Sequence, residues 1–128
     1  MAKVLVVDDD LSVRASMKKV LQGAGYDVLL AANGQEALDR LGAEHIDLLL
    51  LDMNLPLRSG SDILEQIRAK DAALPIITLT TFAREYRSTS TARASAFMEK
   101  PLDASRLLEV IHWLLGNPQK EQRDPGVS

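Results

Sequence analysis

The chain has 128 residues, of which 46% are apolar and 26% charged, which fits one ordinary domain and argues against an enzyme with separate substrate and cofactor domains. Because 15 lysines and arginines are scattered among 18 aspartates and glutamates, no basic footprint for direct nucleic acid binding is evident. The absence of cysteine, with only His45 and His112 as histidines, excludes a disulfide framework and argues against structural zinc. The run Val4–Val7 is too short to cross a membrane and is not a signal peptide, so we expect a cytoplasmic protein.

Short runs of β-branched or leucine residues alternate with longer amphipathic segments, which predicts an α/β fold of five βα units around a parallel sheet. The strands are predicted at 4–7, 27–31, 48–51, 76–80 and about 96–99. Leu48–Leu51 is apolar at every position, which is typical of a strand that is buried on both faces of a parallel sheet. We therefore expect this third strand to be central.

The helices are predicted from caps, turn residues and the spacing of apolar positions. They are expected from about Ser12 to Gly23, after the turn Asn33–Gly34 to Gly42, after an N-cap at Ser61, in a weak form between Thr80 and Phe97, and from about Ala104 to Leu115. Residues 117–128 are polar and have little to bury, so we expect a domain over 1–116 that is followed by a flexible tail.

Polar residues follow four of the predicted strands. They are Asp8 and Asp9, Asp52, Thr80 and Lys100. Ligands of parallel α/β sheets bind beyond the carboxyl ends of the strands, so these side chains should converge on one edge. Three carboxylates, a hydroxyl and an ammonium can hold a hard divalent cation and a phosphoryl group.

Taken singly, these residues also have ordinary structural explanations. Aspartates before a helix, with Asp10 and Ser12 among them, are often only helix caps. A threonine is common in a strand, and a lone lysine before proline is usually solvated. Capping and solvation do not require the residues to share one edge, so their joint placement favours a functional site.

Four motifs carry a resemblance to a known family. They are Val4-Leu-Val-Val-Asp-Asp9, Leu48-Leu-Leu-Leu-Asp-Met-Asn-Leu-Pro56 with Gly60, Leu74-Pro-Ile-Ile-Thr-Leu-Thr80, and Phe97-Met-Glu-Lys-Pro101. From about residue 2 to 116 the chain resembles a response-regulator receiver domain of two-component signal transduction, of the single-domain chemotaxis type. The resemblance implies a flavodoxin-like three-layer sandwich with strand order 2-1-3-4-5.

The resemblance also implies a phosphorelay function. Asp52 would accept a phosphoryl group from a phosphohistidine. Asp9 would bind Mg²⁺ directly and Asp8 largely through water, with Asp52 and the main-chain carbonyl of Asn54 completing the protein ligands. The protein would then be no enzyme in the ordinary sense, because it would catalyse only its own phosphorylation and dephosphorylation.

Four further residues receive roles from the resemblance. Lys100 would pair with Asp52 in the empty site and with a phosphoryl oxygen afterwards, while the hydroxyl of Thr80 binds another oxygen. The bond between Lys100 and Pro101 would be cis. Thr80 and Phe97 would act as the switch that remodels the surface of the fourth helix, fifth strand and fifth helix, although plain core packing is an equal alternative for Phe97.

The chain departs from the family pattern near this signalling surface. The fourth helix is short and rich in serine and threonine, and Arg93 replaces the glycine that commonly ends it. Phe82 lies where the family has a variable side chain near the phosphoryl group. Its bulk predicts a comparatively long-lived phosphorylated state.

The implied partners are a sensor histidine kinase or phosphotransfer protein and an unknown downstream protein, without nucleic acid or membrane. A monomer or weak dimer is expected.

Three rivals remain open. A haloacid-dehalogenase-like phosphatase would use Asp8-x-Asp10-x-Ser12, but this leaves Asp52 unexplained. A flavodoxin-like or dinucleotide-binding module, which shares the architecture, is disfavoured because three aspartates would repel a phosphate. A receiver-like docking module that is never phosphorylated is the third.

Overall fold

The computed structural model describes residues 1–55, 60–80 and 94–116 of the chain. Its strands form one parallel sheet in the order β2-β1-β3-β4-β5, which confirms the predicted flavodoxin-like fold class. The strands are β1 (Lys3–Val7), β2 (Asp27–Ala31), β3 (Leu48–Asp52), β4 (Ile76–Thr80) and β5 (Ala96–Glu99). The predicted strands agree with these bounds to within one residue.

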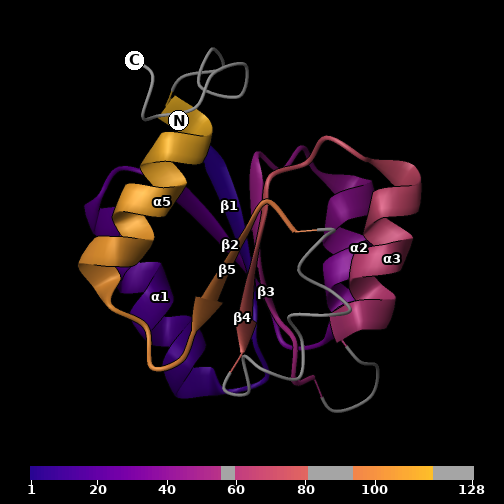
Figure 1. Cartoon of the computed structure of the whole chain (residues 1–128), viewed down its shortest axis with the longest axis horizontal. Helices are drawn as coiled ribbons and strands as arrows, with labels where there is room; N and C mark the ends of the chain where they lie inside the picture. Colours follow the sequence, from indigo (N-terminus) through magenta and orange to yellow (C-terminus); the bar gives the residue numbers. More distant parts are fainter. Residues whose placement is uncertain (56–59, 81–93, 117–128) are drawn as a thin grey trace.

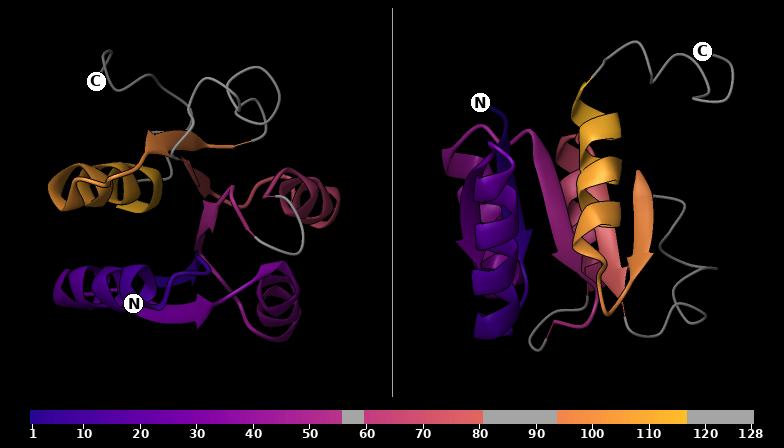
Figure 2. Two further views of the ribbon diagram at one scale, coloured as in Figure 1. Left: turned by 90° about the horizontal axis from the view of Figure 1, so that it is seen from below. Right: turned by 90° about the vertical axis from the view of Figure 1, so that its left-hand side faces the viewer.

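Helices cover both faces of the sheet (Figure 1). They are α1 (Leu11–Gly23), α2 (Gly34–Ala43), α3 (Gly60–Lys70) and α5 (Ala104–Gly116). The end-on view in Figure 2 shows α1 and α5 on one side of the sheet and α2 and α3 on the other. None of the helices in these ranges is long and apolar enough to cross a membrane.

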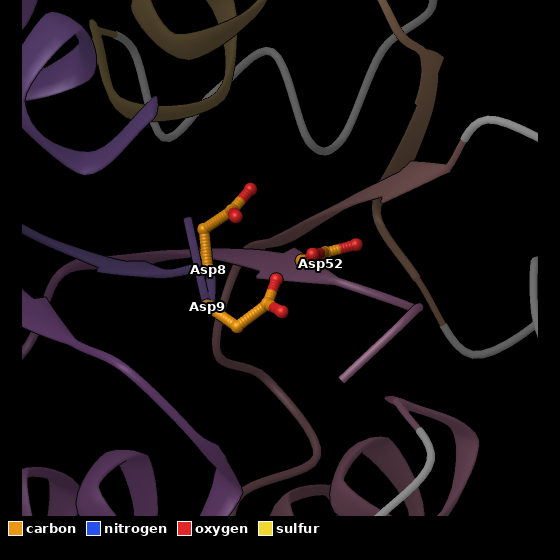
Figure 3. A group of neighbouring side chains, drawn as sticks. All are labelled: Asp8, Asp9 and Asp52. Carbon is orange, nitrogen blue, oxygen red and sulfur yellow. The ribbon is translucent and has the colours of Figure 1, made fainter. Parts of the chain in front are cut away.

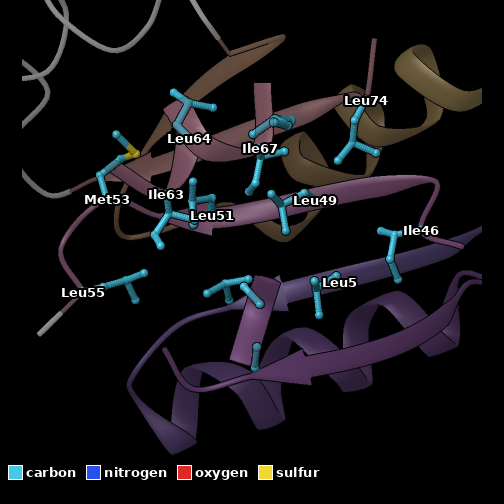
Figure 4. Packing of buried hydrophobic residues seen from close by; sticks show 14 residues of the cluster. Leu5, Ile46, Leu49, Leu51, Met53, Leu55, Ile63, Leu64, Ile67 and Leu74 are labelled. Carbon is cyan, nitrogen blue, oxygen red and sulfur yellow. The ribbon is translucent and has the colours of Figure 1, made fainter. Parts of the chain in front are cut away.

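The sheet separates two apolar cores. Leu49 and Leu51 of β3 pack toward α2 and α3 with Ile63, Leu64 and other residues (Figure 4). Leu48 and Leu50 belong to the core on the opposite face, beneath α1 and α5. Every residue of β3 is buried, because this strand has neighbours on both edges and helices on both faces. The central position predicted from its unbroken leucine run is confirmed.

The ends of the helices show where local chemistry decides the boundaries. Asp10 is the N-cap of α1, and its Oδ1 accepts hydrogen bonds from the backbone N–H groups of Ser12 at 2.8 Å and Val13 at 3.3 Å. After α1 ends, Gly25 turns the chain with φ +96°, a backbone conformation that glycine adopts without a steric penalty.

One predicted cap is wrong. Helix α3 begins at Gly60, so Ser61 lies inside its first turn, and the cap position falls among residues outside the described ranges. The predicted weak fourth helix, Phe82, Arg93 and the predicted tail at 117–128 also lie outside the described residues.

Candidate phosphoryl-transfer site

The carboxyl ends of the parallel strands bring the predicted site residues to one edge of the sheet. Asp8 follows β1 directly, and Asp52 and Thr80 are the last residues of β3 and β4. Lys100 follows β5, and its backbone N–H donates to the carbonyl of Thr80 at 2.7 Å. Residues far apart in the sequence therefore share one edge, as the alternation of strands and helices predicted.

Three carboxylates form a compact cluster at this edge. One carboxylate oxygen from each of Asp8, Asp9 and Asp52 lies within 4.8 Å of the others. Figure 3 shows Asp8 and Asp9 leaving the end of β1 beside Asp52 at the end of β3. Asp8 and Asp52 are buried, whereas Asp9 is exposed. Such a set of hard oxygen atoms, open to solvent on one side, suits Mg²⁺, which keeps several water ligands.

Hydrogen bonds fix both the backbone N–H and the two carboxylate oxygens of Asp8. Its backbone N–H donates to the carbonyl of Ala31 at 3.1 Å, which continues the pairing of β1 with β2. Its Oδ1 accepts from the backbone N–H of Asp10 at 3.0 Å, and its Oδ2 from Lys100 at 2.8 Å. A carboxylate with 0% exposure needs such partners, because an unpaired buried charge is costly.

Lys100 bridges the two buried carboxylates. Its Nζ lies 2.8 Å from Oδ2 of Asp8 and 3.4 Å from Oδ2 of Asp52. The resemblance implied a pair with Asp52, and the structure adds that the shorter contact is with Asp8. The peptide bond between Lys100 and Pro101 is cis, as the resemblance implied.

The pKa of Asp52 is raised above its ordinary value. The largest cause is burial, which penalises the charged form, and the nearby charge of Asp8 adds to it. The backbone N–H of Asn54, which donates to Oδ1 of Asp52 at 3.0 Å, and the ammonium of Lys100 oppose this shift. Burial therefore makes ionisation of Asp52 less favourable than it is for an aspartate in water.

Lys100 responds in the complementary way. Burial favours its neutral form, but the hydrogen bond with Asp8 and the charges of both carboxylates outweigh this effect, so the pKa of Lys100 is raised. The site therefore keeps a positive charge next to the two buried aspartates at neutral pH.

The predicted switch residues lie on the paired strands β4 and β5, two positions apart in register. Thr80 is buried, and Phe97 is half-buried in β5, where it pairs with Thr78. Because side chains of a strand alternate between faces, Thr78, Thr80 and Phe97 project from the same face of the sheet. Phe97 belongs to neither apolar core formed by the described residues.

Sequence reasoning missed one residue beside the cluster. Nη1 of Arg14, in the first turns of α1, donates a hydrogen bond to the main-chain carbonyl of Asp8 at 2.8 Å. Its position six residues after Asp8, beyond a predicted N-cap, was the only signal available in the sequence. A long side chain at this place can fold back over the loop that carries the aspartates.

Comparisons with known proteins agree with this geometry. The response regulator receiver domain matches residues 4–112. The structure of the response regulator TrrA from Thermotoga maritima, solved in complex with Mg²⁺ and BeF, is 36% identical, covers 90% of this chain and 100% of that chain, and has a TM-score of 0.84. A CheY-like receiver domain protein from Methanospirillum hungatei is 32% identical, covers 94% of this chain and 98% of that chain, and has a TM-score of 0.88.

Curated relatives include longer proteins. The response regulator MprA from Mycobacterium avium is 37% identical over 93% of this chain, which spans 53% of that protein. The transcriptional regulatory protein ZraR from Salmonella typhimurium is 34% identical over 91% of this chain, which spans 27% of that protein. The chain thus covers from about a quarter to about half the length of these relatives. It belongs to the response regulator receiver domain family, the signalling domains of two-component systems.

Proposed function

We propose that this receiver domain accepts a phosphoryl group on Asp52 from a phosphohistidine of a sensor histidine kinase or phosphotransfer protein. The observation that carries this proposal is the position of Asp52, which is buried at the strand edge within 4.8 Å of the carboxylate oxygens of Asp8 and Asp9 and 3.4 Å from Nζ of Lys100. The related TrrA was solved with Mg²⁺ and BeF. We assign the protein ligands of Mg²⁺ to Asp8, Asp9, Asp52 and the main-chain carbonyl of Asn54.

The transfer exchanges one bond for another. A carboxylate oxygen of Asp52 attacks the phosphorus, the phosphorus–nitrogen bond breaks, and the electron pair stays on the departing imidazole of the kinase, which then takes up a proton. Mg²⁺ held by the aspartates would supply positive charge for the phosphoryl oxygens. Lys100 already lies within reach of Asp52 and supplies a second positive charge, and Thr80 offers a hydroxyl on the adjacent strand.

The same geometry disfavours the phosphatase alternative. That class would use Asp8 and Asp10 in its nucleophile motif, yet the Oδ1 of Asp10 accepts hydrogen bonds from two backbone N–H groups at the start of α1. Asp10 is also absent from the carboxylate cluster found among the described residues. Asp10 therefore serves as a helix cap, and Asp52 is the better nucleophile.

The domain limits and the partners follow from the same proposal. We assign the receiver domain to residues 1–116; residues 117–128 lie outside the described part of the chain. Phosphorylation of Asp52 would act through Thr80 and Phe97 on the surface that includes β5 and α5, and this surface would bind a downstream protein. We place the protein in the cytoplasm as a monomer or weak dimer that binds neither nucleic acid nor membranes directly.

The test is the intact mass of the protein after incubation with Mg²⁺ and acetyl phosphate. A single phosphoryl increment is expected in the wild type and in Asp10→Asn, weakened in Asp8→Asn and absent in Asp52→Asn. An adduct that survives in Asp52→Asn but depends on Asp8 would move the nucleophile to the end of β1. If no adduct forms, incubation with a phosphorylated histidine kinase domain decides between a strict need for a protein donor and a docking module that is never phosphorylated.

A further inference from the structure

Arg14 connects helix α1 to the loop that carries the aspartates. Its backbone N–H donates to the carbonyl of Asp10 at 3.0 Å as part of the first helical turn. Its side chain folds back, and Nη1 donates to the carbonyl of Asp8 at 2.8 Å. The residue therefore joins the rigid start of a helix to the peptide unit between Asp8 and Asp9.

That peptide unit determines where Asp9 lies. A peptide bond is planar, so a fixed orientation of the Asp8 carbonyl also fixes the N–H and the Cα of Asp9. Asp8 itself is already fixed by hydrogen bonds with Ala31, Asp10 and Lys100. Asp9 is exposed, and its side chain makes no hydrogen bond within the part of the chain that the structure describes. Its position thus depends on the backbone. Two contacts fix this backbone from the helix side: the Asp10 N–H holds the Asp8 side chain, and Arg14 is the one that holds the Asp8 carbonyl.

We propose that Arg14 is a positioning residue that holds Asp9 in the orientation required for Mg²⁺, an inference that rests on the proposed function. Without Arg14 the Asp8 carbonyl would lose its side-chain hydrogen bond, and Mg²⁺ binding would have to supply more of the order of this peptide unit. Removal of groups that orient metal ligands weakens metal binding by roughly 10-fold or more. We expect removal of Arg14 to weaken Mg²⁺ binding by a factor of this order.

The positive charge of Arg14 and its hydrogen bond have opposite effects on Mg²⁺ affinity, which makes the inference testable. A guanidinium near the carboxylates repels Mg²⁺, so the loss of its charge alone would tighten binding. The loss of the hydrogen bond would weaken it. A weaker affinity after removal of Arg14 can therefore not be a simple charge effect.

The experiment is calorimetric titration with Mg²⁺, without a phosphodonor, of the wild type, Arg14→Met, Arg14→Lys and the control Lys18→Met. Lys18 lies one turn further along α1, is exposed, and makes no ion pair or hydrogen bond among the described residues, so its removal changes charge alone. We expect the dissociation constant to rise roughly 10-fold in Arg14→Met and not to rise in Lys18→Met. Arg14→Lys keeps the charge, but its side chain is one atom shorter and has no N–H at the position of Nη1, so a smaller rise than in Arg14→Met is expected.

A second readout separates positioning from a merely structural role. With acetyl phosphate, Arg14→Met should need more Mg²⁺ for half-maximal phosphorylation while it reaches nearly the wild-type rate at saturating Mg²⁺. Two results would overturn this inference and leave the proposed function intact. One is Mg²⁺ binding by Arg14→Met that is as tight as in the wild type or tighter, and the other is an equal rise of the dissociation constant in Lys18→Met. Failure of the wild type to bind Mg²⁺ would overturn both the proposed function and this inference. If Arg14→Met does not fold, Arg14→Lys decides the question, and an unchanged dissociation constant in that variant refutes it.

Discussion

Replacing Asp52 by asparagine should stabilise the metal-free protein, although it abolishes the proposed phosphorylation. Asparagine has the same shape and can still accept the hydrogen bond from the backbone N–H of Asn54. The folded protein raises the pKa of Asp52 above 3.8, chiefly through burial. The charged carboxylate therefore destabilises the fold at neutral pH, and the neutral amide removes this cost.

The magnitude follows from the distances in the site. At an effective dielectric constant of about 20, the Lys100 contact at 3.4 Å attracts Asp52 by about 5 kcal/mol, and Asp8, within 4.8 Å, repels it by at least about 3.5 kcal/mol. Exposed Asp9 adds about 1 kcal/mol of screened repulsion. The Coulomb energies nearly cancel, so the loss of hydration decides the balance. We expect a gain of about 2 kcal/mol, or a melting temperature about 6–10 °C higher.

The assay is thermal unfolding followed by circular dichroism in EDTA, between pH 4.5 and 7.5. Because the pKa of Asp52 is higher in the folded than in the unfolded state, wild-type stability falls relative to Asp52→Asn as the pH rises through the folded pKa. The advantage of the variant should thus grow with pH, and Mg²⁺ should reduce it by stabilising the wild type. Asp27→Asn, an exchange at an exposed position, is the matched control. Equal or lower stability of Asp52→Asn at pH 7 in EDTA, or an advantage that shrinks with rising pH, would refute this reasoning.

Three further predictions concern a helix cap, a buried leucine and a hydrogen-bonded carboxylate. Asp10→Ala should lose about 1 kcal/mol of stability in urea unfolding, because α1 loses its N-cap, while the yield of phosphorylated protein with acetyl phosphate stays at the wild-type level. Leu50→Ala should cost about 3 kcal/mol in the same unfolding assay, because Leu50 is fully buried in the central strand; a cost below about 1 kcal/mol would contradict this packing. The pKa of Asp47 is lowered, mainly by the hydrogen bond from the backbone N–H of Lys3, so its stabilising effect is present above pH 3.8 and is lost as the pH falls through the folded pKa. Asp47→Asn should therefore reduce the loss of stability on acidification, and an unchanged acid profile would speak against this role.

The strands and their order were more predictable than the ends of the helices. Leu48–Leu51 has only one good place in an α/β fold, because four successive leucines need burial on both faces, and the structure puts this strand in the centre. The start of α3 was less determined. Gly60 and Ser61 can both begin a helix, and the bounds of a helix read from local sequence signals are uncertain by one or two residues.

The candidate site was predictable as a set of residues but not as a set of contacts. Parallel strands place Asp8, Asp52 and Lys100 on one edge whatever the details of packing. Which carboxylate lies closer to Lys100 depends on side-chain conformation, and the sequence contains no periodic signal for it. The hydrogen bond of Arg14 was missed for the same reason, because a long side chain can reach several backbone carbonyls.

The parallel sheet also decides where other proteins can be attached to this domain. All strands begin at one edge and end at the other, so Met1, which precedes β1 and is 85% exposed, lies at the edge opposite the carboxylates (Figure 1). Helix α5 runs back against the strands and ends at the same remote edge. The five residues of β1 separate the two edges by about 17 Å. A fluorescent label, an affinity tag or a fused domain at either of these points would leave the edge with Asp52 accessible to a phosphodonor.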